Sequence, residues 1–416
     1  MFTQPPKRFT VASLAWGVCS ILLAIPPQAA VAQYAVELIG KASISGQALD
    51  LSKASNPLAE GVPHNLLGGF SALEYRGDHQ CVLLSDRGPL DGAVDYRCRF
   101  HEFQLRIQEG AKDPVALTLV GTRLFTDPQG RQFTGLAAGF EPTQHLAGRF
   151  DAEGIRRLGE NWVVSDEYGP DLIEFSPTGR ELRRFAVPTD WRIQYPSADR
   201  DEEGAINPTG RLNNNGLEGL AITPQGTLVS LLQRPLMQDS HRTETGWFEG
   251  VNCRMLEIHA SDGTLGRQFV YQLDLESNKL NEILALDEHR FLTIERDGKA
   301  GADAKVKHIM LIDTSTATDV SKIERLPSHE LPAAILPVAK QVYIDMLDPT
   351  FGLAGDEMPE KIEGLAFGPR LQDGRRTLLV CSDNDFVPSN PSILYVFALG
   401  NDTTSNEEDA EQTPRP

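Results

Sequence analysis

The chain has 416 residues, of which 39 are basic and 58 acidic, so its formal net charge is −19. Hydrophobic residues make up 40% of it, which argues against a disordered chain. The excess of carboxylates excludes nucleic acid and anionic membrane surfaces as favoured partners, because both repel a negative protein. The 36 glycines and 27 prolines predict many turns and favour β structure over a helical bundle.

The first 32 residues have the features of an export signal. Lys7 and Arg8 precede an apolar run over residues 9–25, and Ala30 and Ala32 form the small-x-small pattern that signal peptidase cuts. An uncleaved anchor is the alternative, but the run is short for a membrane span. We expect cleavage before Gln33, a secreted or periplasmic location, and no transmembrane segment in the mature chain.

Four cysteines follow the signal: Cys81, Cys98, Cys253 and Cys381. Cys81 and Cys98 flank a loop rich in Gly, Pro and Asp, so this is the disulfide that we expect. Four free buried thiols are the alternative. The sequence contains no CxxC motif and no Cys/His spacing that indicates zinc.

One segment has the pattern of a complete propeller blade. Residues 151–188 contain four short strand-like runs, at 153–158, 161–166, 171–176 and 181–187. Turn residues such as Gly159, Pro170 and Gly179 separate the runs. Short strands at this spacing predict a four-stranded antiparallel meander, which is one blade of a β-propeller.

The opening of this blade recurs along the chain, near residues 70, 153, 217, 281 and 362. Radial repetition of this kind predicts an all-β fold, a single β-propeller over residues 60–399 with six blades of four-stranded antiparallel sheets. We expect the sixth blade, which lacks the motif, in residues 95–150 or shared between the two ends. Paired β-sandwiches are the alternative, but they do not explain the fixed opening.

Other parts of the chain are expected to be less regular. Residues 33–59 form a segment before the propeller, and the polar, acidic residues 400–416 form a disordered tail. Helix is expected to be scarce, and residues 331–349 are the one stretch considered for it.

The repeat predicts a ring of carboxylates at one mouth of the channel, because each hairpin places the start of its first strand opposite the end of its second. The expected pairs are Ser71 with Asp86, Glu153 with Asp166, Glu218 with Gln233, Glu282 with Glu295, and Glu363 with Asp383. Confined carboxylates repel one another, and a bound cation relieves the repulsion. Oxygen-only donors suit Ca²⁺ better than zinc. The predicted calcium ligands are Glu153, Glu218, Glu282, Glu295, Glu363 and Asp383.

Three arginines, Arg87, Arg234 and Arg296, follow the second strands of their hairpins. The guanidinium fork matches phosphate and carboxylate groups. We therefore predict that these arginines, together with Asp166, are catalytic in the hydrolysis of a small anionic ester. The alternative is structural: each repeated glutamate binds backbone amides, and each arginine pairs with a neighbouring glutamate to join adjacent blades.

Five blocks of sequence resemble the phytase-like propeller family, also called "esterase-like activity of phytase". The blocks are GGFSAL (68–73) with LSDRG (84–88), EG (153–154) with SDEYGP (165–170), GLEGLA (216–221) with LQRPL (232–236), FL (291–292) with ERD (295–297), and KIEGLA (361–366) with SDNDF (382–386). The resemblance covers residues 60–399. Ala72 and residues 281–283 depart from the pattern, because the family has glycine there. The resemblance implies a secreted β-propeller that hydrolyses phosphate or carboxylic esters.

Several other catalytic signatures are absent from the sequence: the GxSxG elbow, the P-loop, the GxGxxG fingerprint and the histidine-phosphatase motif RHGxRxP. Two functions therefore stay open. One is a metal-dependent hydrolase of phosphate or carboxylic esters. The other is a non-catalytic propeller that binds a small ligand or a partner at its mouth. We expect a monomer in either case.

Overall fold

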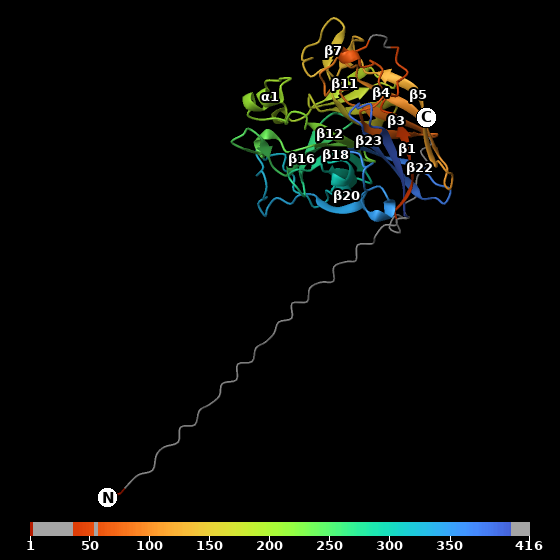
Figure 1. Cartoon of the computed structure of the whole chain (residues 1–416). Coiled ribbons are helices and arrows are strands. Elements are labelled where there is room, and N and C mark those ends of the chain that lie inside the picture. Colours follow the sequence, from red (N-terminus) through yellow and green to blue (C-terminus); the bar gives the residue numbers. More distant parts are fainter. Residues whose placement is uncertain (3–35, 54–56, 401–416) are drawn as a thin grey trace. The chain divides into compact units, whose positions relative to one another are not determined.

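Five four-stranded antiparallel sheets stand around a common centre as the blades of a β-propeller (Figure 1). The structure is a computed structural model that describes residues 1–2, 36–53 and 57–400. Residues 36–53 and 57–400 belong to one compact unit. Apart from residues 1–2, the expected export signal lies outside the described residues, as does the expected disordered tail beyond residue 400.

The first two blades come from the N-terminal half of the chain. From the inner to the outer edge, the first blade consists of β2 (Phe70–Gly77), β3 (Gln80–Ser85), β4 (Arg99–Ile107) and β5 (Val115–Leu124). The second consists of β8 (Ala152–Leu158), β9 (Asn161–Asp166), β10 (Asp171–Phe175) and β11 (Glu181–Phe185). The four strands predicted for residues 151–188 are confirmed, because turns with positive φ at Gly159 and Gly179 separate them.

The third and fourth blades follow in the same inner-to-outer order. The third consists of β12 (Leu217–Ile222), β13 (Thr227–Leu232), β16 (Asn252–His259) and β17 (Leu265–Gln272). The fourth consists of β18 (Lys279–Ala285), β19 (Arg290–Arg296), β20 (Lys307–Asp313) and β21 (Ala339–Asp345). Chain order is thus also blade order around the ring.

The fifth blade joins the two ends of the propeller. Its strands are β22 (Lys361–Arg370), β23 (Arg376–Asp383), β24 (Ser392–Leu399) and, at the outer edge, β1 (Val36–Ile44). β1 runs antiparallel to β24, from Val36 opposite Leu399 to Ile44 opposite Ser392, so the red strand lies beside blue ones in Figure 1. β1, which lies within the segment 33–59 expected to precede the propeller, therefore completes its fifth blade.

The prediction of six blades is wrong, because each of the five repeated openings makes one blade and no blade lacks the repeat. Residues 95–150 instead supply β4 and β5 to the first blade, and the short parallel pair β6 (Gln132–Thr134) and β7 (Leu146–Arg149). A blade shared between the chain ends does exist, but it is the fifth one and it carries the repeat.

Short elements lie in the connections between strands, both within blades and between them. They are α1 (Arg200–Ile206), the 3₁₀ turns η1 (Ala59–Gly61), η2 (Thr189–Trp191), η3 (Met237–Asp239), η4 (Gly301–Asp303) and η5 (Pro349–Phe351), and the hairpin of β14 (His241–Arg242) with β15 (Phe248–Glu249). No α-helix forms over residues 331–349, because residues 339–345 pair with β20 as an outer strand. Within the described part of the chain, no helix has the length and apolar character needed to cross a bilayer.

Each gap between neighbouring blades holds one hydrophobic cluster, five in all. The cluster between the first and second blades is rich in aromatic rings, such as Phe100, Phe125, Trp162 and Phe175. The ring centroids of Phe125 and Phe175 lie 4.4 Å apart. Since both faces of every blade are buried in this way, the strands are held by side-chain packing between sheets as well as by their hydrogen bonds.

The predicted disulfide between Cys81 and Cys98 is wrong. Cys81, Cys98, Cys253 and Cys381 are all free and buried, as the alternative had it. Cys81 packs into the cluster between the fifth and first blades, whereas Cys98 packs into the one between the first and second. The two thiols therefore belong to opposite faces of one sheet, and the Cys98 Sγ lies 3.1 Å from the carbonyl oxygen of Phe150.

A β-bulge interrupts each inner strand at the repeated opening. The strand register shifts between Phe70 and Ala72, Ala152 and Ile155, Leu217 and Leu220, Leu280 and Ile283, and Ile362 and Gly364. Bulges redirect side chains and increase twist. The glycines of the openings are required by close approach: a Cβ on Gly219 would lie 2.5 Å from the carbonyl oxygen of Asn281, on the next inner strand.

The Arg156 guanidinium joins four inner strands. It donates to the carbonyl oxygens of Leu73 on β2 and Leu365 on β22, at 3.0 Å each, and of Ile283 on β18 at 2.9 Å. It also donates to Ile155 of its own strand, β8. Its side chain is only 4% exposed, so these carbonyls replace the water that a guanidinium otherwise keeps.

Glu282 is the ionic partner of this buried arginine. One of its oxygens lies 3.0 Å from an Arg156 nitrogen, and the other accepts the backbone N–H of Leu220 on β12 at 3.1 Å. The pair thereby reaches all five inner strands. Glu282 thus has the structural role that the sequence analysis held as its alternative, and burial raises the pKa of Glu282 to about 7.

We expect Arg156→Met to lower the free energy of unfolding by about 3–5 kcal/mol, because it leaves the Glu282 carboxylate buried without a counter-charge. Adding Glu282→Gln should recover part of that loss, since the buried charge is then removed as well. Urea denaturation of both variants measures the two effects. Equal stabilities of Arg156→Met and the wild-type protein would contradict this role.

Candidate functional site

Three of the repeated glutamates converge at the centre of the ring. Glu153, Glu218 and Glu363, from the bulges of β8, β12 and β22, each place one carboxylate oxygen within 4.8 Å of the others. Asp151, Glu153 and Glu167 form a second group with the same spacing. Glu153 belongs to both groups, and all five side chains are buried. We call these five residues the central carboxylates.

Hydrogen bonds fix the positions of the central carboxylates. Glu363 accepts from the Asn281 amide at 2.8 Å, and the Gln233 amide donates to Glu218. Glu167 accepts the backbone N–H of Gly216 at 3.2 Å. Asn281 and Gly216 belong to a different blade from the carboxylate that they contact, whereas Gln233 follows the strand beside that of Glu218. The arrangement of the blades therefore determines the spacing of the carboxylates.

Burial and mutual repulsion disfavour the ionised forms. Burial, followed by the charges of Glu218 and Asp151, raises the pKa of Glu153 well above its ordinary value. Burial and the charge of Asp151 raise the pKa of Glu167 to about 7. Lys279 lies close enough to these groups to interact with them, and burial and the charge of Arg296 lower its pKa to about 8. Burial and the neighbouring carboxylates therefore both favour the protonated forms of Glu153 and Glu167.

The donor set fits Ca²⁺. It consists of carboxylate oxygens only, two overlapping groups share one residue, and the described residues place no histidine or cysteine in either group. Hard oxygen ligands in this number favour Ca²⁺ over zinc, which prefers nitrogen and sulfur.

Four of the predicted site residues lie apart from the central carboxylates. Glu282 binds Arg156, and Glu295 is held by Tyr271, Asn278 and Lys340 at 2.6, 2.7 and 2.9 Å. Asp166 and Asp383 hold turns instead.

The turns follow the second strands of their hairpins. Asp166 accepts the backbone N–H of Tyr168 at 3.1 Å, and Asp383 that of Asp385 at 2.7 Å. Asp166 also accepts the backbone N–H of Asp151 at 3.0 Å, so it positions one of the central carboxylates. The repeated aspartate is thus a turn-forming residue, as short Asp side chains commonly are.

The three predicted arginines differ in their surroundings. Arg87 is buried and paired with Asp151, Asp91 and, at 3.4 Å, Glu167. Arg296 is buried and paired with Glu363 at 2.6 Å. Both link one blade to the next, which matches the structural alternative.

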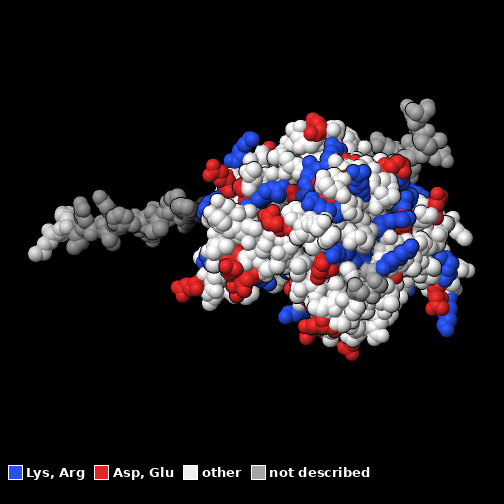
Figure 2. All heavy atoms as spheres, turned by 90° about the horizontal axis from the view of Figure 1, so that it is seen from above, with Lys and Arg blue, Asp and Glu red and all other residues white. Residues whose placement is uncertain are grey.

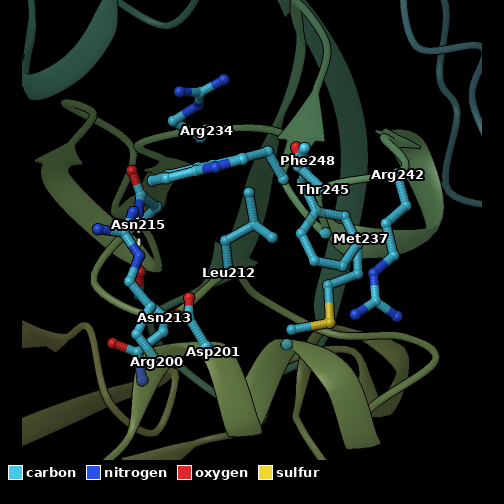
Figure 3. Close-up of a pocket in the computed structure, with 13 residues that line it drawn as sticks. Arg200, Asp201, Leu212, Asn213, Asn215, Arg234, Met237, Arg242, Thr245 and Phe248 are labelled. Carbon is cyan, nitrogen blue, oxygen red and sulfur yellow. Dashed lines mark hydrogen bonds between the residues drawn. The ribbon is translucent and has the colours of Figure 1, made fainter.

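Arg234 faces a pocket instead. Its side chain is half-buried, and its buried Nε has no hydrogen-bond partner among the described residues. The pocket has a volume of about 230 Å³, and Arg200 and Arg242 also line it. The three guanidinium groups lie on different sides of it, around Leu212 (Figure 3). We call this cavity the arginine pocket.

Aromatic rings complete the arginine pocket. Arg200 lies 5.6 Å from the ring centroid of Trp247, and Arg242 lies 5.5 Å from that of Phe248. Trp247 is 62% exposed, which is high for a side chain of its size. Three cations and one acidic residue, Asp201, are the charged groups of its lining, so the pocket is electropositive in an acidic protein.

One loop connects the arginine pocket with the central carboxylates. Asn213 and Asn215 line the pocket, while Asn214 between them accepts a hydrogen bond from Arg87. Gly216, which follows Asn215, donates its backbone N–H to Glu167. Residues 213–216 therefore contact both the arginine pocket and the surroundings of the central carboxylates.

Asp151, Lys279 and two arginines of the pocket, Arg200 and Arg242, were not predicted from the sequence. Asp151 lies two residues before Glu153, but the register shifts between Ala152 and Ile155, so the alternation of a regular strand does not predict that the two side chains meet. No repeat marks Arg200 or Arg242, since Arg200 comes from α1, between the second and third blades, and Arg242 from β14, within the third.

The outer surface is mixed in charge. In the view of Figure 2, Lys and Arg side chains gather over part of the face, with acidic side chains among and around them. Local positive regions therefore exist in spite of the net charge of −19. An anionic ligand is not repelled uniformly by such a surface.

Two comparisons give distant likenesses. One curated protein, named "Uncharacterized secreted protein" from Arthroderma benhamiae, is 30% identical over 304 residues, which cover 56% of this chain and 59% of that protein. Glutaminyl cyclase of Myxococcus xanthus is 10% identical, with a TM-score of 0.36 over 88% of this chain and 97% of that one. The Malassezia sympodialis allergen Mala s 1 is also 10% identical, with a TM-score of 0.38 over 88% and 85%.

The chain spans less than two thirds of the length of the curated relative. The family comparison is more extensive. The model of the family described as "Phytase-like: Esterase-like activity of phytase" matches residues 65–386, well over half of the chain. It spans all five repeated openings, from β2 to the end of β23. The resemblance in the sequence motifs is thereby confirmed, and the chain belongs to the phytase-like family.

Proposed function

We propose that this protein is an exported, metal-assisted hydrolase of small anionic esters, phosphate or carboxylic. The observation that supports the proposal is that the loop of residues 213–216 contacts both an electropositive pocket, which would attract an anion, and a group of carboxylates, which would hold a calcium ion. Neither group alone would suggest an ester, but an anionic ester has both a charge to hold and a bond to polarise.

In this proposal Arg234 is the residue that holds the anionic group. An anion in the pocket would be attracted by the guanidinium of Arg234, which lines the pocket and has no ionic partner among the described residues. Arg200 and Arg242 add positive charge from the exposed side of the pocket. Arg87, Arg296 and Asp166 act as positioning residues, because each contacts a central carboxylate or its backbone.

The central carboxylates would hold Ca²⁺, with Glu153 shared between the two groups. When bound, the ion supplies Lewis acidity toward an ester oxygen and toward water. The chain's own residues set the ligand positions: Arg296 and Asn281 hold the two oxygens of Glu363, and Gln233 holds Glu218. This fixed geometry costs no reorganisation when a ligand arrives.

The test is an assay of phosphate release from phytate and of p-nitrophenol release from carboxylic esters, with millimolar calcium or with EDTA. Calcium-dependent turnover of either substrate supports the proposal. If neither substrate is hydrolysed and inorganic phosphate still binds, the non-catalytic binding propeller takes its place.

We expect Arg234→Ala to lower the turnover of an anionic ester by about 10²–10³-fold, which is the usual effect of losing one group that stabilises developing charge. Its free energy of unfolding should stay unchanged, because the described residues give Arg234 no ionic partner to lose. Arg296→Ala is the matched control. It should lower the free energy of unfolding by about 3–5 kcal/mol, because Glu363 is left buried without its partner.

Steady-state kinetics and urea denaturation of the two variants separate these effects. A fall in stability for Arg234→Ala equal to that for Arg296→Ala would assign both arginines to structure. Activity of Arg234→Ala in proportion to its folded fraction would lead to the same conclusion.

The metal-free protein should lose stability as the pH rises from about 5 to 8. The raised pKa of Glu167, about 7, means that the folded state keeps a proton that the unfolded chain has released above its ordinary pKa. This contribution is complete below that ordinary value and is lost as the pH passes 7. Calcium at a hundredfold excess over Kd should raise the free energy of unfolding by about 2.7 kcal/mol. The accompanying rise in Tm should be larger at pH 8 than at pH 5.5.

Thermal denaturation with calcium or EDTA at the two pH values measures this effect. Glu153→Gln should remove most of the calcium dependence, because Glu153 belongs to both carboxylate groups. Glu257→Gln is the control, since Glu257 pairs with Arg267 on the outer strands of the third blade. A Tm that is independent of calcium at both pH values would exclude the site.

The proposal includes export with cleavage after Ala32, based on Lys7, Arg8 and the Ala30-x-Ala32 pattern. Mass spectrometry of the exported protein should find an N-terminus at or near Gln33. A mature chain that begins at Met1 would contradict cleavage.

A further inference from the structure

A second and larger cavity lies at the edge of the first and fifth blades. Its volume is about 840 Å³, which is within the range of sites that hold small organic ligands. Segments far apart in the sequence enclose it, namely those around residues 46–47, 60–66, 86–91 and 385–388. The arginine pocket and this cavity have no lining residue in common.

The walls of this cavity are mainly apolar. They include Val62, Leu66, Leu90, Phe386 and Val387, together with three prolines. Leu90 is 41% exposed and Val387 is 38% exposed, so apolar surface faces solvent here without cover from the described residues. An apolar ligand that covers these side chains gains the free energy of their removal from water.

The charged groups that line this cavity are all acidic. They are Glu60, Asp86, Asp91 and Asp385, and its lining contains no lysine or arginine. From outside the cavity Arg87 pairs with Asp91 and Lys361 pairs with Asp385, so two cations face four carboxylates. The arginine pocket has the opposite balance. Charge complementarity therefore selects a cationic ligand for this cavity.

Asp86 is the carboxylate of this set that the fold buries. It is 7% exposed, and it accepts the backbone N–H of Gly88 at 2.8 Å. Burial and the charges of Asp383 and Asp151 raise its pKa, while Arg87 and Lys361 oppose them. A cation bound in the cavity would favour the ionised form of Asp86, as an opposite charge does at a few ångströms.

The shape of the cavity is imposed by the surrounding structure. Eight non-glycine residues in the described ranges have positive φ, and five of them line the cavity, among them Leu90 at 59° and Phe386 at 54°. Bulky side chains rarely adopt this conformation, which is unfavourable by about 1–3 kcal/mol each. Tyr96 supports the wall, because its ring packs 5.1 Å from that of Phe386 and its hydroxyl donates to the Leu66 carbonyl.

We propose that this cavity binds a small organic cation, an amine whose alkyl or aryl body lies against the apolar wall and whose ammonium group faces Asp86, Asp91 and Asp385. The wall supplies affinity for the body, and the carboxylates supply selection by charge. A preformed cavity loses little entropy on binding. The site is separate from the proposed ester hydrolysis and does not depend on it.

The test uses three probes: 4-phenylbutylammonium, 4-phenylbutyrate, which has a similar body with the opposite charge, and butylammonium, which lacks the ring. Isothermal titration calorimetry of the full-length folded protein at pH 7 should give the tightest binding for 4-phenylbutylammonium, at least tenfold tighter than either of the others. Its affinity should fall as salt is added, because part of the attraction is between charges.

Two variants locate the binding. Leu90→Asn removes apolar surface at a positive φ that asparagine tolerates better than leucine, so the fold is retained while affinity should fall at least tenfold. Asp91→Asn keeps the same backbone preference and should weaken the ammonium probe several-fold. Leu275→Asn, a change at a 54% exposed leucine outside the cavity, is the control and should have no effect.

Failure of 4-phenylbutylammonium to bind overturns the proposal. Equal binding of 4-phenylbutyrate overturns the selection by charge, and unchanged binding to Leu90→Asn overturns the location. None of these readouts depends on ester hydrolysis, so the two proposals succeed or fail independently.

Discussion

The centre of the propeller is organised around one buried ion pair, Arg156 with Glu282. Arg156 and Glu282 sit where five inner strands meet, and together they bond to the backbone of every one of them. Because a buried charge is costly without partners, the carbonyls that surround Arg156 hold the inner strands at a fixed approach. The hydrophobic clusters between blades hold neighbours together, whereas this pair contacts all five blades at once.

The repeated opening both lets adjacent inner strands approach closely and directs a glutamate towards the centre of the ring. Glycine permits the close approach of adjacent inner strands, and the bulge gives the preceding glutamate a new direction. Four blades carry the glutamate, yet Glu282 is used for the central ion pair, while Glu153, Glu218 and Glu363 converge. Among these four blades, the fourth is the one whose opening lacks glycine. The same repeat therefore supplies both the buried ion pair and the central carboxylates.

Much of the fold could be predicted from the sequence, because the blades are local hairpins. The strands of the second blade were recognisable from turn residues alone. The number of blades was not, because β4 and β5 carry no repeat and resembled a blade of their own. The site was less predictable. Arg87, Arg234 and Arg296 occupy equivalent positions, but the partners of Arg87 and Arg296 come from the neighbouring blades. No spacing within one blade reveals that Arg234 faces a pocket instead.

The pairing of β1 with β24 sets the order in which the molecule can be completed. The first strand of the propeller has its only sheet partner at the far end of the chain, more than 340 positions later, from Ile44 to Ser392. During synthesis, the other strands can find neighbours within their own hairpins, while β1 must wait unpaired until the last strand is available. The ring therefore closes only after the whole propeller has been synthesised. Until then, a process that requires an unfolded chain can still act on it.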